Sequence, residues 1–233
     1  QHEWDGKRFG KLKADFKLTE VYELIHKLQP QALIGSNHHL SPNPGEDFQM
    51  FEKDLPGKGT KDFATSADDI GNLPLEVCET INGSWGFNLK DRKHKSEKEL
   101  VQYLVKAAGY GSNLLLNVGP MPNGKIQDEH IESLKKIGKW VKQNGQTIYN
   151  TKRGPISPSD EIASTQDGNI VYIHLLDNNK SEYFIEGFKS KFKNISYLDS
   201  NKKVSYKKTK TGLHLILDKK EINSIDTILI MEL

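Results

Sequence analysis

The chain has 233 residues, of which 35% are hydrophobic and 27% are charged, and these proportions are typical of a globular protein. No apolar run approaches the roughly 18 residues that a membrane-spanning helix needs, so we expect no membrane span. The net charge of +2 implies no strong bulk attraction to nucleic acid, and the single cysteine excludes an internal disulfide.

The first 81 residues alternate between helical and strand-like patterns. Apolar residues recur at helical spacing over residues 18–28, and Pro30 ends the predicted helix. A loop rich in Gly, Asp, Ser and Thr covers residues 57–72, and loops of this length are often functional. Three short runs predict strands: 32–35 (ALIG), 47–52 (DFQMFE) and 75–81 (LEVCETI).

Two more helices and a fourth strand follow. Ser96 and Glu99 form a capping box, which predicts the start of a helix. The apolar run 113–118 predicts a strand buried on both faces, and helical spacing over 131–141 predicts a helix that stops at residues 144–145. Continuous apolar strands between helices favour a parallel sheet. This sheet is the second half of a TIM-like (β/α) barrel or, nearly as well on pattern alone, an open doubly wound sheet.

The pattern changes after residues 153–155. Short strand-like runs separated by turn residues predict a small all-β sandwich from there to the end. The runs are 169–176, 182–185, 194–198, 203–206, 213–217 and 227–231. We therefore predict two domains: 1–154, the C-terminal half of the barrel, and 155–233, the β-sandwich.

Glutamates near predicted strand ends are candidates for acid–base chemistry. Glu52 closes the second predicted strand, and the carboxyl ends of the strands form the catalytic mouth of a parallel barrel. Glu46 precedes the same strand and would lie at its opposite end, whereas Glu79 lies near the end of the third strand. The alternative is that each is an ordinary solvated carboxylate paired with a nearby cation.

Polar and aromatic residues after the strands could bind a sugar. Asn37, His38 and His39 directly follow the first strand and could donate hydrogen bonds to sugar hydroxyls. No third ligand at a useful spacing supports a metal site there. Trp85, between two glycines just after the third strand, could stack on the apolar face of a sugar. The alternatives are two ordinary loop histidines and an aromatic side chain folded onto the core.

Four segments in this order and spacing closely resemble the α-L-fucosidases of glycoside hydrolase family 29. The segments are 28–39 (LQPQALIGSNHH), 45–57 (GEDFQMFEKDLPG), 75–88 (LEVCETINGSWGFN) and 111–126 (GSNLLLNVGPMPNGKI). The resemblance covers residues 18–155, and the rest is only loosely similar to the C-terminal β-domain of that family.

The resemblance implies a retaining hydrolase that removes α-linked L-fucose from fucosylated glycans and needs no cofactor. Such enzymes use two carboxyls about 5–5.5 Å apart, one as nucleophile and one as acid/base. By its place in the family pattern, Glu52 resembles the acid/base of one large branch, and Glu46 is nearer that of the other. The strand-end argument favours Glu52. His39 falls where some members place an Arg near the fucose, and Trp85 where an aromatic meets the C5-methyl side.

The nucleophile of the resembled family is an Asp in a W-x-D-G-like motif that ends a barrel strand. Trp4, Asp5 and Gly6 match this motif only in part, and residues 1–3 do not form a buried strand. We therefore expect the nucleophile upstream of residue 1 and an N-terminal half-barrel that completes the fold, because a half-barrel leaves sheet edges unpaired. The chain alone is then an inactive fragment. The resemblance also implies a secreted or periplasmic location, with any targeting segment out of view.

Two other hypotheses belong to different classes. The first is a non-catalytic fucose- or glycan-binding protein on the same scaffold, which a substituted nucleophile position would indicate. The second is an unrelated doubly wound α/β protein. That protein would need a glycine-rich phosphate-binding loop, and the sequence contains none.

Overall fold

The computed structural model describes residues 16–37, 41–58 and 70–233. These residues form two compact units. The first unit comprises the described residues up to Glu79 together with Ser112–Leu116. The second comprises Thr80–Gly111 together with Asn117–Leu233. Among the described residues, no helix has the length and apolar character needed to cross a membrane.

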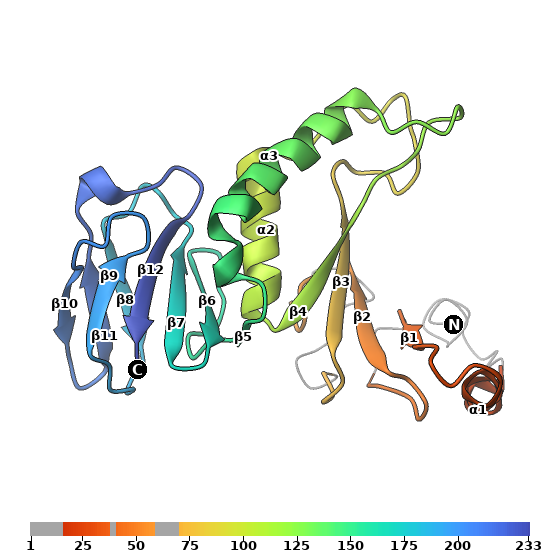
Figure 1. Ribbon diagram of the computed structural model, residues 1–233, viewed down its shortest axis with the longest axis horizontal. Helices are drawn as coiled ribbons and strands as arrows, with labels where there is room; N and C mark the ends of the chain where they lie inside the picture. Colours follow the sequence, from red (N-terminus) through yellow and green to blue (C-terminus); the bar gives the residue numbers. More distant parts are fainter. Residues whose placement is uncertain (1–15, 38–40, 59–69) are drawn as a thin grey trace, which may run out of the picture. The chain divides into compact units, whose positions relative to one another are not determined.

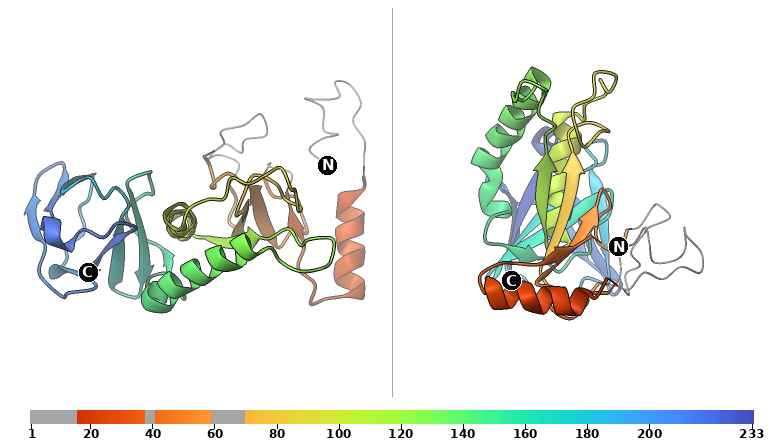
Figure 2. Two further views of the ribbon diagram at one scale, coloured as in Figure 1. Left: turned by 90° about the horizontal axis from the view of Figure 1, so that it is seen from above. Right: turned by 90° about the vertical axis from the view of Figure 1, so that its right-hand side faces the viewer.

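The first unit is built on a four-stranded sheet with the order β1-β2-β3-β4 (Figure 1). Strands β1 and β2 are parallel, and so are β2 and β3, which confirms the predicted parallel arrangement for these three. Helix α1 (Leu18–Leu28) lies beside the edge strand β1 in the views of Figure 2. The strands are β1 (Gly35–Ser36), β2 (Phe48–Glu52), β3 (Leu75–Thr80) and β4 (Ser112–Asn117).

Two apolar runs of this sheet are less buried than the sequence predicts. In the predicted run 32–35, strand β1 begins only at Gly35, and Leu33 before it is 75% exposed. The prediction that residues 113–118 are buried on both faces is wrong, because Leu115 on β4 is 46% exposed. In the described part of the chain, β1 and β4 are the two edges of the sheet, so each has a strand neighbour on one side only.

The second unit contains the predicted β-sandwich. A five-stranded sheet, β5-β6-β7-β12-β9, faces a three-stranded sheet, β10-β11-β8. Alternating residues of each strand fill the space between them, for example Ile173 on β7 and Leu215 on β11, both fully buried. The strands are β5 (Lys152–Arg153), β6 (Ile162–Asp167), β7 (Ile170–Leu175), β8 (Glu182–Glu186), β9 (Asn194–Tyr197), β10 (Ser205–Lys208), β11 (Gly212–Ile216) and β12 (Thr227–Glu232).

Helices α2 (Glu97–Gly109) and α3 (Asp128–Asn144) cover the other face of the five-stranded sheet. The predicted capping box at the start of α2 is confirmed, since Ser96 and Glu99 each bond the other's backbone N–H. Val105 and Trp140 pack with Tyr172 of β7 in a single apolar cluster. Short 3-10 turns follow α3 at Gly145–Thr147 and precede β12 at Lys219–Glu221.

The sequence pattern predicts neither the short strand β5 nor strand β6, and β6 is the longer of the two. Its residues Ala163, Ser164 and Thr165 are all fully buried although two are polar. Ser164 exchanges hydrogen bonds with the backbone of Ile156, and Thr165 donates to the carbonyl of Thr147 at 2.6 Å, so both hydroxyls are satisfied inside the fold. The predicted domain division at residue 154 stays a prediction.

Candidate active site

Glu52 and Asn37 meet at one edge of the first unit's sheet. Glu52 is the last residue of β2, and Asn37 directly follows β1. Because the two strands are parallel and adjacent, their carboxyl ends present these side chains to each other. The Asn37 amide Nδ2 donates to Glu52 Oε2 at 2.9 Å. The Asn37 carbonyl oxygen Oδ1 is buried and has no hydrogen-bond partner among the described residues.

Glu46 lies at the opposite, amino end of β2. Its carboxylate is 7% exposed and is held by three hydrogen bonds. The backbone N–H and the side-chain amide of Asn43 donate at 2.8 and 3.2 Å, and the hydroxyl of Tyr22 on α1 donates at 3.2 Å. These partners tie helix α1 and the preceding turn to the start of the strand. Glu46 therefore acts here as a structural anchor.

The start of β2 is fixed by a second carboxylate, Asp47. Its Oδ2 accepts from the backbone N–H of Ile34 at 2.7 Å and contacts His26 Nε2 at 2.9 Å. These hydrogen bonds, that of Ile34 first, hold the pKa of Asp47 below its usual value. Next to Asp47, Phe48 of β2 pairs with Gly35 of β1. A Cβ on Gly35 would fall 2.2 Å from the Phe48 ring. Glycine thus allows β1 to approach β2.

The pairing of β2 with β3 decides which side chains share the face of Glu52. Glu52 is in register with Cys78, so Cys78 is on the same face, while Glu79 points to the opposite one. Cys78 is half-buried, and its Sγ lies 3.5 Å from the carbonyl of Phe51. Burial first, and the nearby Glu52 carboxylate second, raise the pKa of the Cys78 thiol. Glu79, a candidate by its strand position, is buried on the face away from Glu52.

Trp85 belongs to the second unit and is half-buried in the segment that follows β3. Asn117, at the end of β4, donates from Nδ2 to the carbonyl of Trp85 at 2.7 Å. A Cβ on Gly119 would fall 2.6 Å from the backbone of Gly86, so the glycine permits this close approach of two loops. The loop that carries Trp85 is therefore fixed by backbone contacts.

Other sequence-predicted residues lie outside the described part of the chain. They are His38, His39, Asp5 and most of the loop 57–72. Within the described ranges, no group of three or more His, Cys, Asp or Glu residues could hold a metal ion. The neighbours of Glu52, by contrast, were not predicted from the sequence. The sequence predicts Asn37 as a sugar ligand and does not connect Cys78 with Glu52, because both contacts of Glu52 depend on the register of parallel strands.

Known proteins with similar sequences are alpha-L-fucosidases. A sequence model of the Alpha-L-fucosidase family matches residues 2–146. The plasma alpha-L-fucosidase of Pongo abelii is 39% identical over 161 residues, which cover 58% of this chain and 35% of that protein. The human plasma alpha-L-fucosidase is 30% identical over the same length and is covered to 34%. The chain thus spans about a third of the length of these relatives.

Solved structures show the same likeness. Alpha-L-fucosidase isoenzyme 1 from Paenibacillus thiaminolyticus superposes with a TM-score of 0.74 at 28% identity, covering 93% of this chain and 53% of that one. An alpha-L-fucosidase of Bacteroides thetaiotaomicron gives the same TM-score at 18% identity, a likeness of fold alone. The chain spans about half of each of these two structures.

Proposed function

Because the chain belongs to the alpha-L-fucosidase family, we propose that it supplies the acid/base side of a retaining alpha-L-fucosidase that releases terminal α-linked L-fucose from glycans. The observation that carries the proposal is the pair formed by Glu52 and Asn37 at the carboxyl ends of adjacent parallel strands. That edge is where β/α barrels place their catalytic residues.

The proposed reaction assigns one proton transfer to Glu52 in each of two steps. In the first, Glu52 donates its proton to the glycosidic oxygen while a second carboxylate attacks the anomeric carbon, and a covalent fucosyl-enzyme forms. In the second, Glu52 takes a proton from the water that hydrolyses this intermediate. Asn37 holds the Glu52 carboxyl by its 2.9 Å hydrogen bond and so limits its orientations. We assign the nucleophile to a segment equivalent to the part of the longer relatives that lies before the stretch similar to this chain.

The same proposal makes strands β1–β4 the second half of a (β/α) barrel. The exposure of Leu33, two residues before edge strand β1, and of Leu115 on edge strand β4 supports it, since closing the barrel would pair both edges. In this proposal, residues 1–154 complete a barrel with an N-terminal half, and residues 155–233 are the accessory sandwich. His38, His39 and Trp85 would bind the fucose. Of the two predicted locations, secreted and periplasmic, the plasma enzymes among the relatives support the secreted one.

The choice of Glu52 over Glu46 rests on their partners. Glu46 is buried and takes three hydrogen bonds from Tyr22 and Asn43, which leaves it little access to a substrate. Glu52 is half-buried and ends its strand. An acid/base must reach both the leaving oxygen and a water molecule, so the less buried carboxyl fits the task better.

The test compares Glu52→Gln with Glu46→Gln in the full-length protein. We expect Glu52→Gln to lower kcat/KM about 10²–10⁴-fold on an alkyl α-L-fucoside, the usual range for general acid catalysis. The loss should be smaller on 4-nitrophenyl α-L-fucoside, because 4-nitrophenolate leaves without a proton. Glu46→Gln should lower the melting temperature and change kcat/KM little.

Three outcomes would contradict the proposal. Glu46→Gln could abolish turnover while Glu52→Gln keeps it, which would move the acid/base to the other end of β2. Glu52→Gln could reduce turnover equally on both substrates, which would show that no proton transfer to the leaving group was lost. Finally, the wild-type protein could bind fucose without turnover, which would make it a glycan-binding protein.

A further inference from the structure

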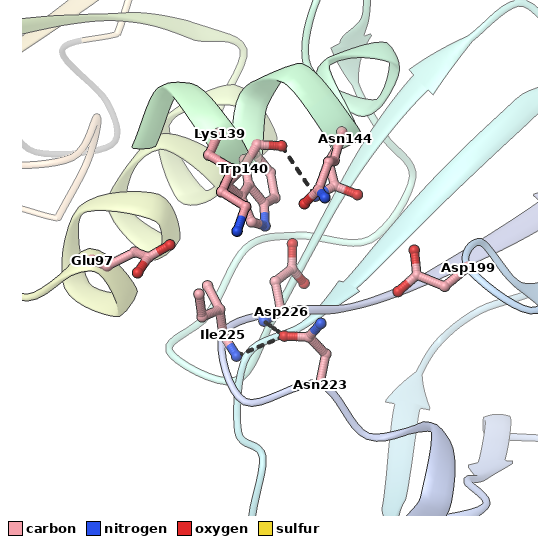
Figure 3. Close-up of a pocket in the computed structure, with 9 residues that line it drawn as sticks. Glu97, Lys139, Trp140, Asn144, Asp199, Asn223, Ile225 and Asp226 are labelled. Carbon is pink, nitrogen blue, oxygen red and sulfur yellow. Dashed lines mark hydrogen bonds between the residues drawn. The ribbon is translucent and has the colours of Figure 1, made fainter. Parts of the chain in front are cut away.

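The second unit contains a pocket of about 410 Å³ between helix α3, the start of α2 and the chain segment before β12 (Figure 3). This volume is within the range of small-molecule sites, about 300–1,000 Å³. Exposed side chains, among them Lys139 and Asn223, form its rim, and the buried Trp140 and Asp226 form its floor. None of these residues belongs to the proposed active site, so the pocket raises a separate question.

The floor carries an unsatisfied carboxylate oxygen. The side chain of Asp226 is fully buried, and its Oδ2 lies 2.6 Å from Nδ1 of His174, which is also fully buried. The other oxygen, Oδ1, is buried and has no hydrogen-bond partner among the described residues. A buried acceptor without a partner destabilises the fold, so such groups usually mark a missing donor. Asp226 lines the pocket, and Figure 3 shows its carboxylate pointing into that space.

Side chains with hydrogen-bond donors line the same pocket. The Oδ1 of Asn223 accepts from the backbone N–H of Ile225 at 2.9 Å and more weakly from that of Asp226 at 3.4 Å. These two bonds orient the amide so that its Nδ2 remains available as a donor. The ammonium of Lys139 and the indole nitrogen of Trp140 point toward the same space in Figure 3. The pocket therefore presents both donors and acceptors, as a ligand with several hydroxyls requires.

The charges limit the ligand further. Three carboxylates line the pocket, from Glu97, Asp199 and Asp226, against the single ammonium of Lys139. This excess of negative charge disfavours phosphate, sulfate and carboxylate ligands. No set of described residues satisfies the requirements of a metal site, so a bound cation does not explain the cluster. We propose that this pocket binds one neutral saccharide unit through its hydroxyls, with Asp226 Oδ1 as the central acceptor.

The test is a calorimetric titration of the full-length protein with methyl β-D-galactopyranoside and N-acetylglucosamine. Glucuronate and putrescine serve as anionic and cationic counterparts. We expect binding of at least one neutral sugar, weakened about 3–10-fold by Lys139→Ala and by Asn223→Ala, because each removes one hydrogen bond. Both residues are exposed, so the variants should fold. The matched control is Lys142→Ala, an exposed lysine on the same helix that does not line the pocket.

The remaining outcomes overturn the proposal. Stronger binding of putrescine would make the pocket a cation site. No binding of either sugar at 50 mM would mean that the pocket holds only water. Binding that Glu52→Gln weakens, and that both rim variants leave unchanged, would belong to the proposed active site. This last result separates the two proposals, since it would refute sugar binding in this pocket and leave the proposed fucosidase activity unaffected.

Discussion

Replacing Asn37 by alanine should weaken catalysis without unfolding the sheet. The variant removes the 2.9 Å hydrogen bond from Nδ2 to Glu52 Oε2. Hydrogen bonds to charged groups contribute about 1.5–3 kcal/mol, and both partners here are only half-buried, so the low end of that range applies. About 1.4 kcal/mol corresponds to a factor of ten in rate. We therefore expect kcat/KM on an alkyl α-L-fucoside to fall about tenfold in the full-length protein.

A double-mutant cycle decides whether the loss acts through Glu52. In a Glu52→Gln background, Asn37→Ala should cost much less than tenfold, because the carboxylate that it positions is already gone. The matched control is Asn43→Ala, which removes a similar amide from Glu46 at the other end of β2. Equal losses in both backgrounds, or a larger loss from Asn43→Ala, would refute the reasoning.

Three further predictions concern the first unit. Since the Glu52 carboxylate helps to raise the pKa of the Cys78 thiol, after burial, Glu52→Gln should lower that pKa and speed alkylation by iodoacetamide at pH 8; an unchanged rate would separate the two side chains. Because the pKa of Asp47 is lower in the folded state, its ionised carboxylate stabilises the fold at pH values above its unfolded-state pKa of about 3.9. This stabilisation is lost as the pH falls through the pKa of the folded state. Urea midpoints of Asp47→Asn should therefore be lower at pH 7 and should depend less on pH below about 4. Finally, the chain without a preceding half-barrel should self-associate, and replacing the exposed Leu33 and Leu115 by serine should raise its monomer fraction in gel filtration.

Local signals predicted the helices and most strands of this fold. The capping box of Ser96 and Glu99 and the stop at residues 144–145 each depend on a few adjacent residues, and both are confirmed. Strand β6 has no such signal, because its buried centre is Ala163, Ser164 and Thr165. The hydroxyls of Ser164 and Thr165 can be buried because backbone carbonyls of residues distant in sequence accept their hydrogen bonds. A sequence pattern of apolar residues cannot show this.

The candidate site divides in the same way. The strand pattern predicts that a carboxylate, Glu52, ends β2. The residues that contact this carboxylate depend on the register of β2 with its neighbouring strands. A shift of one residue between β2 and β3 would turn Cys78 away from Glu52 and bring Glu79 beside it. Likewise, Asn37 meets Glu52 only because Gly35 lets β1 pair closely with Phe48. Register depends on packing between segments that the sequence does not place.

Strand length also bears on the two glutamates as one catalytic pair. Strand β2 spans four residue steps from Phe48 to Glu52, which at about 3.3 Å per residue is roughly 13 Å, and Glu46 lies two residues before the strand begins. A retaining enzyme needs its two carboxyls about 5–5.5 Å apart, which neither side chain can bridge across that length. Glu46 and Glu52 therefore cannot serve as nucleophile and acid/base together. Only one of them can act with a carboxylate from another strand, and the one at the carboxyl end, Glu52, shares its edge with Asn37.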